Sequence, residues 1–283
     1  MCFSEYDQMF KYRFKKDHQN VTQNLQGRLS EGAKLSTNMY YSRLTNSGFS
    51  RLHCACEFRN GTQIIDDILT NGVDIDEVSR NGSALCIAAW YGKTDMVRHL
   101  LRRGARTGLA GSDGYTELLM AAARGHSETC SVLVEHGADI NQKHPITEAS
   151  ALETAVMWGH HQTLLTLLSL GAEVNDRSWT GFTSLATACQ LGRLVHVLSL
   201  LQAVADPRVP DMNGAPPSHK AAQYDNVSTL RVLLEHGCDK EQVKGMKVSF
   251  FFIDCSFSRL TSQEGLHSWL LRFLVQTDVW RYY

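Results

Sequence analysis

The sequence predicts an all-α solenoid in which each unit is a pair of helices followed by a β-turn or a short hairpin. Three regularities predict it: leucines recur every 33 or 34 residues, a pair of small residues follows each leucine, and glycines close most of the apolar segments. The leucines are Leu52, Leu85, Leu118, Leu152 and Leu185, and the next period falls on Ser218. A fixed period of this length is typical of stacked units that bury their apolar faces against their neighbours.

The first helix of a unit is expected to begin at a hydroxyl residue. Such residues stand just before the recurring leucines, at Ser83, Thr116, Ser150 and Thr183. A hydroxyl at the N-cap accepts a hydrogen bond from a free backbone N–H of the first turn. Ser150 is followed three residues later by Glu153, which is the spacing of a capping box.

The second helix of a unit is predicted from apolar residues at the spacing i, i+3, i+4, such as Val97, Leu100 and Leu101. Two sets of glycines bound this helix. Mid-repeat glycines turn the chain between the two antiparallel helices, and closing glycines supply the left-handed residue at which the second helix ends. The mid-repeat set is Gly92, Gly125, Gly159 and Gly192, and the closing set is Gly72, Gly104, Gly137, Gly171 and Gly237.

This pattern resembles the ankyrin repeat. The family's opening motif, G-x-T-P-L-H-x-A-A, is matched in part by 114–118 and 181–185. Its closing motif, L-L-x-x-G-A-x-x-N, is matched in part by 133–141 and 167–175. The resemblance covers residues 47–242 in six copies, and it implies an ankyrin-repeat solenoid that binds other proteins.

The pattern is irregular in four places. The first copy has one extra residue, and the junction of copies three and four has another around His144–Pro145. Copy five lacks its closing glycine within 202–207, and copy six opens Pro216–Pro217–Ser218, without the capping hydroxyl and the core leucine. Because the stability of a solenoid is a sum over neighbouring repeats, we expect the junction of copies five and six to be the weakest.

Three segments are expected along the chain. Residues 1–46 form a polar N-terminal arm, 47–242 the repeat domain, and 243–283 an atypical C-terminal tail. The tail is rich in aromatic residues and has no repeat register. Two interpretations of it remain open: a cap over the open end of the stack, with a short helix around 266–275, or an atypical chain end.

Composition argues against several functions. The net charge is -1 and no domain is strongly basic, so we expect no nucleic-acid binding. No apolar run approaches the ~20 residues of a membrane span, and the N-terminus lacks a signal-peptide pattern. We therefore expect a monomeric protein of the cytosol or nucleus that does not bind membranes.

Neither a metal site nor a catalytic site is expected. His53, Cys54 and Cys56 resemble a zinc-site fragment, but no second ligand pair stands at finger spacing, so buried thiols are the better interpretation. The resemblance implies that His53 and His219 bond locally to the turn. Phosphate-loop, G-x-S-x-G and HExxH motifs are absent, so we expect neither a cofactor nor enzymatic activity.

The candidate binding surface consists of large side chains at repeated positions. The residue before the mid-repeat glycine is Tyr91, Arg124, Trp158 or Leu191 in copies two to five, and Tyr224 takes this place in copy six. The resemblance implies that this row faces the concave groove. Tyr, Trp and Arg dominate interface energetics. The predicted partner-binding residues are Trp90, Tyr91, Tyr115, Arg124, Trp158, Trp179, Phe182 and Tyr224.

The leading hypothesis is therefore a protein-binding adaptor or scaffold. An alternative is a substrate receptor of a cullin-type ubiquitin ligase, because the chain resembles ankyrin and SOCS-box adaptors. The tail carries Leu270–Leu274 but lacks the L-C-R sequence and the proline of that box. A further hypothesis is modification, since Asn141 and Asn175 are similar to asparagine hydroxylase sites in ankyrin turns.

Overall fold

The structure is a computed structural model that describes residues 51–56, 61–79 and 81–238. The predicted arm, 1–46, and the predicted tail, 243–283, lie outside the described residues. The chain divides into two compact units, of which the first ends at Trp179 and the second begins at Thr180.

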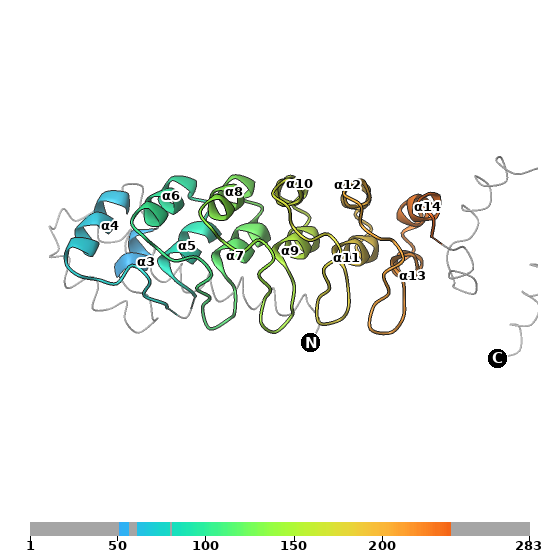
Figure 1. The fold of residues 1–283 in the computed structure, drawn as a ribbon, viewed down its shortest axis with the longest axis horizontal. Helices are drawn as coiled ribbons and strands as arrows, with labels where there is room; N and C mark the ends of the chain where they lie inside the picture. The colour runs from blue at the N-terminus through green and yellow to red at the C-terminus, as the bar shows by residue number, and fades with distance from the viewer. Residues whose placement is uncertain (1–50, 57–60, 80, 239–283) are drawn as a thin grey trace, which may run out of the picture. The chain divides into compact units, whose positions relative to one another are not determined.

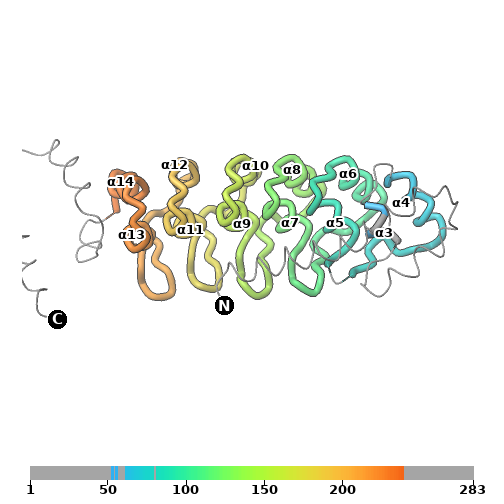
Figure 2. The backbone as a smooth tube through the Cα atoms, turned by 180° about the vertical axis from the view of Figure 1, so that it is seen from behind, coloured from blue at the N-terminus to red at the C-terminus, as the bar shows by residue number. Residues whose placement is uncertain are grey.

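The first unit stacks helix pairs in two layers (Figure 1). The first helices of the pairs are α3 (Arg51–Ala55), α5 (Ala84–Trp90), α7 (Glu117–Arg124) and α9 (Ala151–Trp158). The second helices are α4 (Gly61–Thr70), α6 (Thr94–Arg102), α8 (Ser127–Glu135) and α10 (His161–Ser169). Seen from behind in Figure 2, the connecting loops of this unit project beside the layer of first helices.

The second unit repeats the same arrangement. Its first helices are α11 (Ser184–Gln190) and α13 (Pro217–Gln223), and its second helices are α12 (Leu194–Gln202) and α14 (Val227–Glu235). Within this unit α11 packs against α13, and α12 packs against α14. The predicted all-α repeat solenoid is confirmed.

The core consists of the residues that carry the repeat. The five recurring leucines are at most 2% exposed, and the small residues that follow them are fully buried. Small side chains allow adjacent first helices to approach closely, so the repeat places the least bulk where helices pack most tightly. These fully buried small residues include Ala88, Ala89, Ala121, Ala122, Ala155, Ala188, Ala221 and Ala222.

Turns rather than regular strands connect the described helix pairs. The isolated antiparallel bridge between Ser79 and Gly82 lies before α5. Gly82 accepts from the backbone N–H of Ser79 at 2.9 Å, and Ser79 accepts from that of Gly82 at 3.1 Å. Short polar turns therefore connect the helix pairs of the described residues, as the sequence predicts.

Three of the four predicted capping hydroxyls accept a hydrogen bond. Ser83 accepts from the N–H of Cys86, Ser150 from that of Glu153, and Thr183 from that of Ala186.

Thr116 is the exception, so the prediction that its hydroxyl caps α7 is wrong. Its backbone is extended, with φ -86° and ψ 168°, as at the other caps. Its buried hydroxyl nevertheless has no hydrogen-bond partner. The difference therefore lies in the orientation of the side chain and not in the path of the backbone.

The predicted glycines adopt left-handed backbone conformations. The mid-repeat glycines have φ between 63° and 82°, and the closing glycines between 79° and 92°. Two non-glycine residues occupy equivalent positions in the irregular copies. Val204, with φ 63°, stands where copy five lacks its closing glycine, and Asp225, with φ 56°, replaces the mid-repeat glycine of copy six.

Polar side chains at the starts of the second helices tie adjacent repeats together. Each reaches back to a carbonyl oxygen at the end of the preceding first helix. The pairs of the first unit are Lys93 Nζ with Cys56 at 2.9 Å, His126 Nε2 with Trp90 at 3.1 Å, and His160 Nε2 with Ala123 at 3.1 Å. In the second unit, the amide of Asn226 donates to Cys189 at 2.8 Å and to Gln190 at 3.0 Å. These contacts satisfy carbonyl groups that a helix end leaves unpaired.

Among the described residues, the helices are too short and too polar for any of them to cross a bilayer.

Candidate protein-binding surface

In the first unit, the predicted binding row lies where the first helices end. Tyr91 is the C-cap of α5, Arg124 is the last residue of α7, and Trp158 is the last residue of α9. Arg124 is exposed, whereas Tyr91 and Trp158 are half-buried. The repeat therefore brings these three side chains to the same end of successive first helices.

In the second unit, the same repeat position holds Leu191 and Tyr224, the C-cap residues of α11 and α13. They are 44% and 51% exposed. The side-chain amide of Gln190 donates to the Tyr224 hydroxyl at 3.4 Å. Tyr224 therefore presents much of its ring to solvent while its hydroxyl is held by the neighbouring repeat.

Trp90, one of the predicted partner-binding residues, has a largely buried side chain. Its side chain is only 8% exposed. The guanidinium of Arg124 lies 4.9 Å from the centroid of the Trp90 ring, within the range of a cation–π contact. The indole lies beneath the next repeat and supports Arg124, so Arg124 rather than Trp90 is the accessible residue of this pair.

Two aromatic residues predicted at turn tips lie in the first unit. The half-buried ring of Tyr115 lies against that of His144, with ring centroids 4.5 Å apart and planes tilted by 58°. Trp179 is 55% exposed, and its backbone N–H donates to the carbonyl of Thr147 at 3.2 Å. Of the two, Trp179 offers the larger free surface.

Phe182, at a turn tip of the second unit, is half-buried. The Nζ of Lys220 lies 5.0 Å from the centroid of its ring, and it also lies 2.7 Å from Oδ2 of the buried Asp211. Burial raises the pKa of Asp211, but the hydrogen bonds from Lys220 and from backbone N–H groups outweigh it, so this pKa lies below its usual value. Phe182 is thus part of a fixed cluster.

His144 organises the irregular turn, a role that sequence reasoning missed. Its Nε2 lies 2.8 Å from the carbonyl oxygen of Asp113, and its Nδ1 accepts from the N–H groups of Ile146 and Thr147. These partners require a neutral ring protonated on Nε2. Burial lowers the pKa of His144, which favours this form. The extra residue at His144–Pro145 was the available signal.

His53 has the expected structural role, but its bond reaches the following repeat. Its Nε2 lies 2.9 Å from the carbonyl oxygen of Gly82, in the turn before α5. Burial lowers the pKa of His53, so the neutral ring is favoured. His219 is half-buried beside Ser218 on α13.

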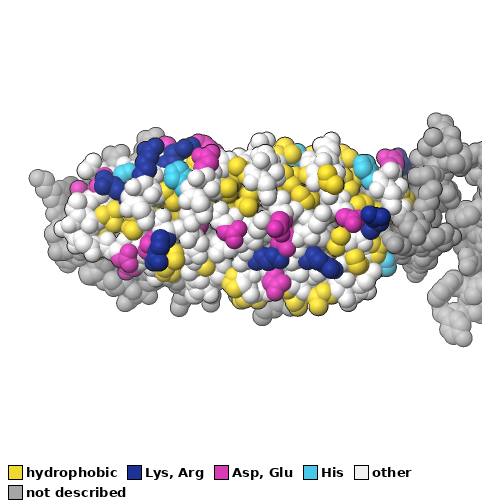
Figure 3. Space-filling model, in the orientation of Figure 1, with side chains coloured by type: hydrophobic (Ala, Val, Ile, Leu, Met, Phe, Trp, Pro, Cys, Tyr) yellow, Lys and Arg dark blue, Asp and Glu magenta, His cyan; other side chains and the backbone are white. Residues whose placement is uncertain are grey.

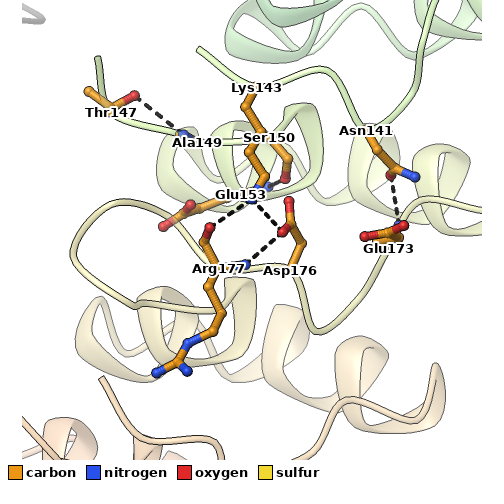
Figure 4. A network of polar contacts seen from close by, with 9 residues as sticks. All are labelled: Asn141, Lys143, Thr147, Ala149, Ser150, Glu153, Glu173, Asp176 and Arg177. Atoms are coloured by element: carbon orange, nitrogen blue, oxygen red, sulfur yellow. Dashed lines mark hydrogen bonds and ion pairs between the residues drawn. The ribbon is translucent and has the colours of Figure 1, made fainter. Parts of the chain in front are cut away.

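Adjacent loops of the first unit are joined by polar contacts (Figure 4). Lys143 Nζ lies 2.6 Å from Oδ1 of Asp176 and donates to the carbonyl of Arg177 at 2.9 Å. Asn141 Oδ1 accepts from the backbone N–H of Glu173 at 3.0 Å. The Asn141 side chain, considered above as a modification site, therefore has a structural function between two loops.

Several exposed apolar residues were not predicted. Ile146, in the irregular turn, is 65% exposed. On α12, Val195 and Leu198 are also exposed. The corresponding positions of α6 hold Asp95 and Arg98. Apolar residues at the solvent-facing positions of a second helix were the signal that sequence reasoning left unused.

The buried cysteines are unreactive thiols. Burial raises the pKa of Cys86 and of Cys130 to about 12. Cys56 donates to the carbonyls of Leu52 and Ala84. Among the described residues, no group of three or more His, Cys, Asp or Glu side chains is placed to hold a metal ion.

Comparison with known families finds a match to ankyrin repeats in three copies. The matches cover 52–144, 85–178 and 152–244, which together exceed half of the chain. They coincide with the helix pairs described above.

The similar proteins are matched over only part of their length. The chain is 31% identical over 160 residues to ankyrin repeat and KH domain-containing protein mask-1 of Caenorhabditis elegans, covering 56% of this chain and 6% of that protein. It is 32% identical over 150 residues to target of rapamycin complex 2 subunit AVO2 of Saccharomyces cerevisiae (strain ATCC 204508 / S288c), covering 50% and 34%. It is 28% identical over 189 residues to an L-asparaginase of Dirofilaria immitis, covering 65% and 32%. The chain thus spans about a third or less of these relatives.

Proposed function

Because this chain belongs to the ankyrin-repeat family, we propose that it acts as an adaptor or scaffold that binds a partner protein along the row at the ends of its first helices. The observation that carries the proposal is the alignment of Tyr91, Arg124 and Trp158 on successive repeats. Exposed or half-buried aromatic and arginine side chains supply most of the binding energy in protein interfaces. The predicted concave groove supplies the surface along which the partner lies.

The arrangement suits a partner that extends over several repeats. Each repeat contributes one large side chain, and the polar contacts between repeats hold these side chains at fixed positions. Rigid, preorganised contacts lose less conformational entropy on binding. The face in Figure 3 carries acidic, basic and apolar side chains in small groups, which is the mixed composition of non-obligate interfaces.

The experiment that tests this proposal is co-purification from cells. Tagged wild-type chain is compared with the Tyr91→Ala, Trp158→Ala double variant and with Arg102→Ala, an exposed position on the second-helix layer. A partner that is retained by Arg102→Ala and lost by the double variant supports the row. Retention of every partner by a correctly folded double variant excludes it.

The ubiquitin-ligase hypothesis stays a prediction. It depends on a recruiting box in 243–283, outside the described residues, and no observation on the repeats favours it. The same co-purification tests it, because elongin and a cullin would accompany both the wild-type chain and the double variant.

We also propose that the protein is a non-enzymatic monomer of the cytosol or nucleus that binds neither nucleic acid nor membranes.

A further inference from the structure

The loops of the first unit carry an excess of exposed carboxylates. We call the segments 71–79, 104–116, 137–149 and 171–179 the hairpin face. Five of its acidic side chains are exposed and form no ion pair with a described residue. They are Asp74, Glu77, Asp139, Glu148 and Glu173.

Two of the basic residues of this face are already neutralised. Arg106 Nε lies 2.7 Å from Oδ2 of Asp76, and Lys143 Nζ lies 2.6 Å from Oδ1 of Asp176. Each of these pairs joins two successive loops of the face. Arg177 is the other described basic residue of the face. The hairpin face is therefore net acidic.

The hairpin face also carries a pair of exposed apolar side chains. Ile146 is 65% exposed and Trp179 is 55% exposed. Their loops are joined by the hydrogen bond from the N–H of Trp179 to the carbonyl of Thr147, next to Ile146. Glu148 follows Thr147 in the chain, so a negative charge adjoins the apolar pair.

An open hollow lies on the same face. It has a volume of about 500 Å³ and is lined by residues 173–177. Glu173 and Asp176 place two carboxylates in this lining, of which Asp176 is paired with Lys143, and Arg177 also lines it.

We propose that the hairpin face binds a basic protein segment, in which an apolar side chain packs against Ile146 and Trp179 while Lys or Arg side chains lie against the exposed carboxylates of the face. This inference goes beyond the proposed function, because the hairpin face contains none of the row residues Tyr91, Arg124 and Trp158, and it assigns the chemistry of a partner that binds there. Complementary charge steers encounter and selects the partner, and the apolar pair supplies the anchor. Nucleic acids and anionic lipid surfaces carry the same sign as this face and are repelled.

The test is a selection from a random twelve-residue peptide library on the immobilised full chain. Enriched peptides should carry a net positive charge and at least one large apolar residue, and their affinity should fall as salt rises. The Glu148→Gln, Glu173→Gln variant should bind them about 3- to 10-fold more weakly, since each exposed pair contributes modestly. Ile146→Ser, Trp179→Ala should weaken binding by about 10-fold or more.

The matched control is Asp95→Asn, Glu135→Gln, which removes the same charge from exposed positions of α6 and α8 and should leave affinity unchanged. Circular dichroism confirms the fold of each variant. Enrichment of neutral or acidic peptides that lose binding when Tyr91 or Trp158 is replaced would overturn the charge assignment and leave the proposed function standing. Equal affinity of the two charge variants would overturn it as well. Failure of every peptide to bind would count against both.

Discussion

The imidazole of His160 occupies the space beside Gly125, in the repeat before it. A Cβ on Gly125 would overlap the His160 ring, and the φ of Gly125 is 79°. His160 Nε2 lies 3.1 Å from the carbonyl oxygen of Ala123, so the absence of a side chain on the glycine lets the histidine reach the end of the preceding helix. The same relation joins Gly92 to His126 and, in the second unit, Gly192 to Asn226.

Gly125→Ala should therefore destabilise the protein more than Gly137→Ala. Both glycines have a positive φ, so both substitutions should cost about 1 kcal/mol or more through backbone strain. A Cβ at Gly137 meets nothing within 4 Å, whereas one at Gly125 meets His160. Urea unfolding of the two variants isolates the contact. Equal losses of unfolding free energy would show that the histidine shifts without cost.

Val204→Gly should stabilise the protein by about 1 kcal/mol, because a β-branched residue is strained at positive φ. Val204 has φ 63° and is 81% exposed, so little packing is lost with its side chain. Gly171→Val, at the equivalent position of copy four, should destabilise by a similar amount. Thermal unfolding measures both changes. A lower stability of Val204→Gly would mean that the valine contributes a contact that outweighs its strain.

The sixth copy should open before the other copies. Its first helix, α13, has Pro216 at the N-cap and no side-chain cap, and Asp225 adopts φ 56° in place of a glycine. Hydrogen exchange followed by mass spectrometry should show faster exchange in 203–238 than in 84–170. Exchange at the same rate in both segments would contradict a weak junction of copies five and six.

Glu117 should lower stability at neutral pH. It is fully buried, Oε1 accepts from the N–H of Gly108 at 2.8 Å, and Oε2 has no hydrogen-bond partner. Burial raises the pKa of Glu117 above its ordinary value of 4.5. The folded state thus binds the proton more tightly than the unfolded state, so the penalty is absent below the unfolded pKa and appears as pH rises through the folded pKa.

Glu117→Gln keeps an oxygen for Gly108 and cannot ionise. It should raise the unfolding free energy at pH 7 by about 1 kcal/mol or more, and this gain over the wild-type chain should vanish in mild acid. Comparing the two proteins at each pH cancels the titration of the histidines. The same difference at every pH would show that ionisation of Glu117 is not its cause.

The helix pairs were predictable because their signals are local and repeated. Leu85, Leu118 and Leu152 recur at one period, and the glycines mark where both helices end. The closing glycines do not mark every left-handed position. Val204 adopts a left-handed conformation without a glycine, because the stacked helices on either side determine the path of the chain.

The surface was less predictable, because exposure depends on the neighbouring repeat. Trp90 and Trp158 occupy neighbouring positions of the motif, yet Arg124 covers the Trp90 ring. Ile146 is exposed because His144 fixes an irregular turn through three hydrogen bonds. The repeat period of 33 or 34 residues does not predict the conformation of that turn.

The central claim is tested most directly by the affinity of a purified partner for single variants of the row. Once a partner has been isolated, its binding to the wild-type chain, Trp158→Ala and Arg102→Ala is measured by titration calorimetry. We predict that Trp158→Ala weakens binding by about 1 to 4 kcal/mol while Arg102→Ala leaves it unchanged. Unchanged affinity of a correctly folded Trp158→Ala variant would contradict binding along the ends of the first helices.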